Sequence, residues 1–180
     1  MHESSNTNNF AISISEVIFS KDSQKLQSLL ENFMLKSISS MDTANESFYQ
    51  GMMLGLCAAL GDRYKVKSNR ESGLGRFDLQ LKPKEKSLPG FIFEFKHTND
   101  THADLTLLAE NALNQIDEKK YCAEMLEDGI KPIIKIGIAF RGKSAVVKRS
   151  TEWLLRRVIL KRCAKERGNN IAHQLPFKLE

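Results

Sequence analysis

Hydrophobic residues in the first third of the chain recur at helical spacing in two segments. Residues 22–38 follow the start signal Asp22-Ser23 with apolar side chains three or four positions apart, which predicts an amphipathic helix. A second helix is predicted from about Thr43 to Gly61, because its apolar positions keep the same spacing and glycine is a common helix stop.

In the middle of the chain the helical spacing gives way to alternating apolar and polar residues, which is the pattern of strands. Tyr64 and Val66 alternate with lysines and predict a strand that runs into the turn residues 71–75. Further strands are predicted at 76–81 and 91–96, joined by a loop rich in proline and lysine. Three successive strands with short polar connections predict an antiparallel meander.

Beyond this meander the pattern predicts a helix, a buried strand and a last helix. The first helix begins after residue 101 and ends at Gly129, and the apolar run 132–140 predicts a central strand reached by a crossover. The last helix is predicted over residues 144–167. No linker is long enough to divide the chain, so we expect a single domain over residues 1–180 with a core at about 43–142.

Positive charge is concentrated in the last predicted helix. The chain has a net charge of +5, and residues 143–168 hold nine Lys or Arg against Glu152 and Glu166. Such a basic helix suits a polyanionic partner, although a charge run is as often a solvated surface. Three widely spaced cysteines argue against a disulfide framework or a zinc cluster. With no apolar run of about 18 residues, we expect a cytoplasmic protein with no membrane partner.

Two charges lie on the third predicted strand, in Glu94-Phe95-Lys96, and Asp78 lies on the strand before it. Because side chains i and i+2 share a face, Glu94 and Lys96 should lie together while Phe93 and Phe95 pack on the opposite face. Asp78 and Glu94 can converge on one Mg²⁺, and Lys96 can orient a water or offset developing charge. Alone, the pattern is loose and also fits a surface ion pair.

Further motifs surround these charges along the chain. In order they are Glu46-x-x-Tyr49, Ser68-Asn69-Arg70-Glu71-x-Gly73-x-Gly75-Arg76-x-Asp78, Glu94-x-Lys96, Gln115-Ile116 with Tyr121, and the strand 136–140. In the order and spacing of these motifs the stretch 46–140 resembles the PD-(D/E)XK nuclease superfamily. It is most similar to the nuclease domain found C-terminal to AAA-ATPase-like domains in bacterial proteins. Gln50 stands where a histidine usually follows the helical Tyr, which removes a polar neighbour from the site.

The resemblance implies a fold, a reaction and a set of site residues. The fold is α/β: a restriction-endonuclease-like mixed sheet, an antiparallel meander plus a crossover strand, flanked by helices on both faces. The reaction is hydrolysis of phosphodiester bonds by a Mg²⁺-dependent endonuclease that favours DNA over RNA and accepts Mn²⁺. A homodimer and an ATPase partner stay open. The implied metal ligands are Asp78, Glu94 and Glu46, the catalytic residues are these three with Lys96 and Gln115, and the substrate-binding residues are Arg76, Tyr121 and Tyr49.

Two other functions also stay open. The first is a catalytically inactive nucleic-acid-binding or protein-interaction module of the same fold, although the filled acid, acid and lysine positions favour an enzyme. The second is a P-loop NTPase, because the segment from Gly137 to Ser144 matches G-x4-G-K-[ST] between a predicted strand and a predicted helix. Against it, residues 138–140 resemble strand core, and no Asp follows Ser144 to bind Mg²⁺.

Overall fold

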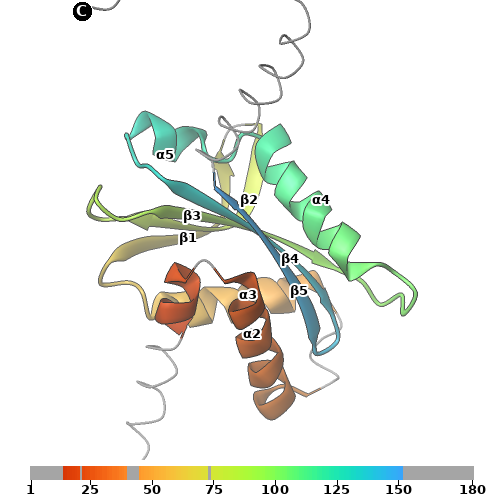
Figure 1. Ribbon diagram of the computed structural model, residues 1–180. Coiled ribbons are helices and arrows are strands. Elements are labelled where there is room, and N and C mark those ends of the chain that lie inside the picture. The colour runs from red at the N-terminus through yellow and green to blue at the C-terminus, as the bar shows by residue number, and fades with distance from the viewer. Residues whose placement is uncertain (1–13, 21, 40–44, 73, 152–180) are drawn as a thin grey trace, which may run out of the picture.

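A mixed sheet with strand order β1-β2-β3-β4-β5 forms the centre of the computed structural model, which describes residues 14–20, 22–39, 45–72 and 74–151 (Figure 1). Strands β3 and β4 are parallel, and the other neighbours are antiparallel. The predicted α/β sheet, with its meander and crossover strand, is therefore confirmed. The strands are β1 Tyr64–Ser72, β2 Gly75–Pro83, β3 Gly90–His97, β4 Ile133–Arg141 and β5 Ser144–Thr151.

Helices cover both faces of the sheet, as predicted. Helices α2 (Ser23–Ser37) and α3 (Glu46–Ala58) lie on one face, and α4 (Leu105–Glu118) lies on the other and makes the crossover from β3 to β4 (Figure 1). The short helix α5 (Ala123–Glu127) follows α4. Side chains of Asp22, Asn45 and Asp104 accept hydrogen bonds from the first turns of α2, α3 and α4, which defines where each helix begins. No helix in the described ranges is long and apolar enough to cross a membrane.

The two faces of β3 carry different kinds of side chain. Phe93 and Phe95 are buried in the larger core, which the strands form with α2 and α3. Glu94 points to the opposite face, where Gly137 of β4 is its neighbour in the register. A Cβ on Gly137 would overlap the Ala109 carbonyl oxygen of α4. The missing side chain therefore lets α4 lie close to the sheet beside Glu94.

The prediction of a helix over residues 144–167 is wrong for its first eight residues, which form β5. Gly142 adopts a φ of 55° in the tight turn after β4, and Arg141 pairs with Ser144, so the chain folds straight back as a hairpin. Ala145 and Val147 are buried at every second position, the period of a strand. The rest of the predicted basic helix, 152–167, lies outside the described residues.

The same hairpin excludes the P-loop alternative. Residues 137–140 belong to β4 and pair on one side with β3 and on the other with β5. Their backbone N–H groups therefore serve the sheet, whereas a phosphate loop needs such groups exposed ahead of a helix. Ser144 begins a strand instead of a helix, so the motif match has no phosphate-binding geometry.

Candidate active site

Strands β2 and β3 part at the position where the predicted acids lie. Their pairing includes Leu79 with Phe93 and goes no further toward the start of β2. Continuing that register by one residue sets Asp78 opposite Glu94. Asp78 Oδ2 accepts a hydrogen bond of 2.7 Å from the backbone N–H of Phe95, so a side chain replaces a backbone acceptor where the strands separate. The two predicted acids are thus neighbours at a fork in the sheet.

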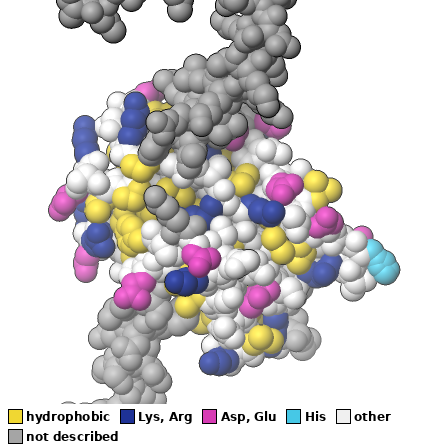
Figure 2. All heavy atoms as spheres, viewed as in Figure 1, with side chains coloured by type: hydrophobic (Ala, Val, Ile, Leu, Met, Phe, Trp, Pro, Cys, Tyr) yellow, Lys and Arg dark blue, Asp and Glu magenta, His cyan; other side chains and the backbone are white. Residues whose placement is uncertain are grey.

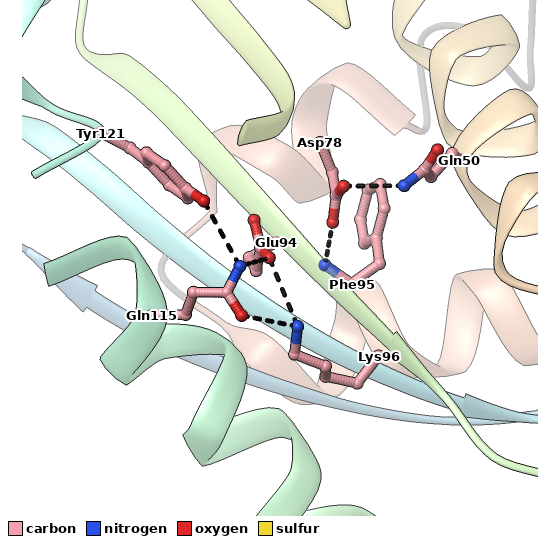
Figure 3. A network of polar contacts seen from close by, with 7 residues as sticks. All are labelled: Gln50, Asp78, Glu94, Phe95, Lys96, Gln115 and Tyr121. Atoms are coloured by element: carbon pink, nitrogen blue, oxygen red, sulfur yellow. Dashed lines mark hydrogen bonds and ion pairs between the residues drawn. The ribbon is translucent and has the colours of Figure 1, made fainter. Parts of the chain in front are cut away.

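Glu94 and Lys96 share the face of β3 that is covered by α4. Lys96 Nζ lies 3.4 Å from Glu94 Oε1 and donates a hydrogen bond of 2.7 Å to Gln115 Oε1 (Figure 3). The Gln115 side-chain nitrogen donates in turn to Glu94 Oε1 and, at 3.3 Å, to the Tyr121 hydroxyl. Gln115 therefore connects Lys96, Glu94 and Tyr121.

The two carboxylates occupy a poorly hydrated position. Burial, aided by the charge of Asp78, raises the pKa of Glu94 to about 8, and Glu94 is only 3% exposed. Burial also raises the pKa of Asp78 to about 6, an effect that the Phe95 N–H opposes and the charge of Glu46 reinforces. Without a cation, these carboxyl groups are therefore harder to ionise than carboxyl groups in water.

The donor set at the fork fits a hard divalent cation. Glu94 Oε1 faces two donors, but its buried Oε2 has no hydrogen-bond partner in the described part of the chain. A carboxylate oxygen without a hydrogen-bond partner, next to a second carboxylate, is a suitable ligand for Mg²⁺. Mg²⁺ is commonly bound by one or two carboxylates and keeps several water ligands. The described ranges contain no group of three or more His, Cys, Asp or Glu side chains placed to hold a metal, so Asp78 and Glu94 would act as a pair of ligands.

Glu46 and Arg76 lie at the margin of the site. Glu46 is the first residue of α3 and is exposed, yet its charge raises the pKa of both Asp78 and Glu94. Arg76 is exposed on β2, two residues before Asp78. On the face drawn in Figure 2, basic and acidic side chains are interspersed among the described residues. Arg76 is thus an exposed cation two residues from Asp78 along β2.

Tyr49 belongs to the core of the protein. Its side chain is fully buried, and its ring stacks on Phe140 with centroids 4.2 Å apart and planes 9° from parallel. Its hydroxyl donates a hydrogen bond of 2.8 Å to the Gly142 carbonyl oxygen. These contacts tie α3 to the β4–β5 hairpin, and the substrate contact predicted for Tyr49 does not fit this position.

Gln50 is the site residue that sequence reasoning missed. Its side-chain nitrogen donates a hydrogen bond of 2.7 Å to Asp78 Oδ1, and Asn69 Nδ2 donates to Gln50 Oε1 at 3.4 Å (Figure 3 shows the first contact). The expectation that glutamine removes a polar neighbour is thereby corrected. The available signal was spacing, because Gln50 follows Glu46 by four residues and therefore shares its helix face.

Comparison with known proteins gives one match. A sequence model of the PD-(D/E)XK nuclease superfamily matches residues 44–150, a range that runs from just before α3 to the last residues of β5. It includes every site residue described above. Searches of curated proteins and of solved structures found no match.

Proposed function

We propose, from the premise that this chain belongs to the PD-(D/E)XK nuclease superfamily, that it hydrolyses phosphodiester bonds of DNA with Mg²⁺ at the Asp78 and Glu94 carboxylates. Membership of the superfamily implies a hydrolytic nuclease that uses a divalent metal. The observation that carries the finer proposal is the buried, unpartnered Oε2 of Glu94 at the fork, with Asp78 on the adjacent strand. A carboxylate held in this way is costly to the fold unless a cation uses it.

Each residue of the site has a distinct part in this reaction. Asp78 and Glu94 would hold Mg²⁺, or Mn²⁺ in its place, with Glu46 adding negative charge nearby. When bound there, the cation would polarise the phosphate and lower the pKa of a water. Lys96, held by Gln115 and Glu94, keeps a positive charge beside the carboxylates, where it offsets charge that develops on the phosphate or orients the attacking water.

The contacts to the nucleic acid are expected from the exposed cations. Arg76 is the described cation closest in sequence to Asp78, and the net charge of +5 favours a polyanionic substrate. Tyr121 is only 2% exposed and accepts from Gln115, so we assign it to support of Gln115 in place of direct phosphate contact. Phosphate contacts of this kind make binding weaken steeply as salt is raised.

The alternative from another functional class is a module of the same fold that binds nucleic acid or protein without cleaving it. The contacts among Glu94, Lys96 and Gln115 favour the enzyme, because a site retained only for binding has no need of a buried carboxylate with an orphaned oxygen. An enzyme would cleave nucleic acid only with a divalent metal, whereas the binding module would cleave nothing with or without one. A cleavage assay therefore separates the two functions.

The test is cleavage of plasmid, linear duplex, single-stranded DNA and RNA in Mg²⁺, Mn²⁺ or EDTA. We expect wild type to nick or linearise plasmid only with metal, and Asp78→Asn, Glu94→Gln and Lys96→Met to lose on the order of 100-fold or more in rate. Lys36→Met, an exposed lysine of α2, is the matched control and should cleave normally. If wild type cuts nothing while all variants bind DNA equally, the protein is the inactive module.

The same assay addresses the finer parts of the proposal. Products from closed circular plasmid identify an endonuclease, and a rate that rises with the square of protein concentration would indicate that two copies of the chain act together. Stimulation by ATP in the presence of an added ATPase would support an ATPase partner. Cleavage of RNA in preference to DNA would overturn the assigned substrate and leave the proposed chemistry intact.

A further inference from the structure

The Asp78 carboxylate receives hydrogen bonds from two different elements of the fold (Figure 3). The Phe95 N–H of β3 donates to Oδ2 and the Gln50 amide of α3 donates to Oδ1, each at 2.7 Å. The terminal torsion of an aspartate is otherwise broad, so two donors on different oxygens fix the plane of the carboxylate. An ionised carboxylate has about four acceptor positions, and each oxygen of Asp78 therefore keeps one lone pair for another ligand.

Gln50 is itself oriented, and the residue that orients it is Asn69. A carboxylate only accepts hydrogen bonds, so the end of the Gln50 amide that faces Asp78 must be its NH₂ group. The other end is an acceptor, and Asn69 Nδ2 lies 3.4 Å from it. The three side chains thus form a directed chain from Asn69 through Gln50 to Asp78, in which each donor meets an acceptor.

The backbone of β1 is shaped to place Asn69 in that chain. The register pairs Ser68 with Leu79 and Arg70 with Phe77, and the intervening pair of Asn69 with Asp78 is missing from it. Asn69 has a φ of 49°, in the left-handed region that Asn enters more readily than most residues. A local break in β1 therefore lies directly beside Asp78, on the side opposite β3.

We propose that Gln50, oriented by Asn69, is a positioning residue that holds the Asp78 carboxylate with one lone pair of each oxygen available to a divalent cation. This proposal rests on the proposed function, because it assigns a role to Gln50 in the same site. Gln50 acts through Asp78 and is distinct from the groups that touch the reacting phosphate. It supplies a neutral donor, so it adds no charge that competes with the cation.

The test is direct titration of the full chain with Mn²⁺ by calorimetry, beside steady-state cleavage. Gln50→Met keeps the length of the side chain and removes its donor, and Asn69→Gly removes the amide while tolerating a positive φ. Loss of a residue that orients a metal ligand costs about 10- to 100-fold in metal affinity or activity. We expect Gln50→Met to raise the Kd for Mn²⁺ about tenfold and Asn69→Gly to raise it severalfold.

Kinetics separates positioning from a purely structural tie between α3 and the sheet. At limiting Mn²⁺ the kcat of Gln50→Met should fall about tenfold with an unchanged KM for DNA, and saturating Mn²⁺ should restore much of it. Gln24→Met makes the same substitution at an exposed position of α2 and should match wild type. The inference is overturned if Gln50→Met binds Mn²⁺ as tightly as wild type, including the case in which only its melting temperature falls.

Failure of the proposed function gives a different result. A wild type that binds Mn²⁺ and cleaves no nucleic acid rejects the nuclease proposal, while the Mn²⁺ titrations of the variants still decide the role of Gln50. A wild type that does not bind Mn²⁺ overturns the positioning role as well.

Discussion

Replacing Glu94 with glutamine should stabilise the metal-free protein at pH 8 while removing its activity. Glutamate in an unfolded chain ionises near pH 4.5, whereas the buried Glu94 has a pKa of about 8. Between these two values the folded protein holds a proton that the unfolded chain has released. The free energy of unfolding therefore falls as pH rises through this window and stays low above it. The glutamine side chain of the variant is neutral throughout and avoids that loss.

The size of the effect follows from the same pKa. A rise from 4.5 to about 8 corresponds to about 5 kcal/mol of unfavourable ionisation if the site stays rigid and dry. Entry of water and movement of neighbouring side chains relieve part of this cost. We therefore expect the free energy of unfolding of Glu94→Gln to exceed that of wild type by about 1–3 kcal/mol at pH 8 and to differ little from it at pH 5.

Urea denaturation at pH 5 and pH 8 in EDTA measures this difference directly. Glu85→Gln, which neutralises an exposed glutamate, is the control and should be equivalent to wild type at both values. Adding Mg²⁺ or Mn²⁺ at pH 8 should raise the stability of wild type and leave Glu94→Gln nearly unchanged, because a ligand stabilises the state that binds it. A Glu94→Gln protein that is less stable than wild type at pH 8 would refute the reasoning.

Three further predictions concern the core and the substrate. Gly137→Ala should destabilise the fold by about 1–3 kcal/mol in urea, because its methyl group would overlap the Ala109 carbonyl oxygen of α4. Tyr49→Phe should lower the free energy of unfolding by about 1 kcal/mol, because it removes the hydrogen bond to the Gly142 carbonyl oxygen, and it should leave kcat and KM unchanged. A raised KM would instead indicate that Tyr49 contacts the substrate. Arg76→Ala should weaken DNA binding and reduce the magnitude of the slope of log affinity against log salt concentration by about 1. An unchanged slope would show that Arg76 makes no phosphate contact.

The acids and lysine of the site could be predicted because their arrangement follows from local geometry. Alternation along an extended strand is independent of distant contacts, so Glu94 and Lys96 had to share the face opposite Phe93 and Phe95. The structure confirms that division, with both phenylalanines buried in the larger core. The approach of Asp78 to Glu94 was open from the predicted meander and was specified by the resemblance, because it depends on how two strands align.

The sequence was less informative where long-range packing decides the structure. Val146 and Val147 fit a helical or a strand pattern over so short a segment, and their pairing with β4 makes them β5. The contact between Gln50 and Asp78 joins residues 28 positions apart and depends on the depth at which α3 lies on the sheet. Strand β5 and the contact of Gln50 are each fixed by an element distant in the chain. The spacing from Glu46 places Gln50 on the helix face of the site, but it does not identify Asp78 as its partner.

The dual use of Asp78 determines how an inactive form should be made for trapping bound DNA. Alanine at this position would leave the Phe95 N–H without an acceptor and loosen the fork. The inactivity of Asp78→Ala would therefore reflect a disturbed structure as well as the loss of a metal ligand. Asparagine keeps an oxygen for Phe95 and turns its NH₂ toward Gln50. If the amides of Gln50 and Asn69 both turn over, every donor again meets an acceptor. The negative charge of Asp78 thus sets the donor-to-acceptor direction of the hydrogen bonds from Asn69 through Gln50. In Asp78→Asn that direction can be reversed while every hydrogen bond is kept.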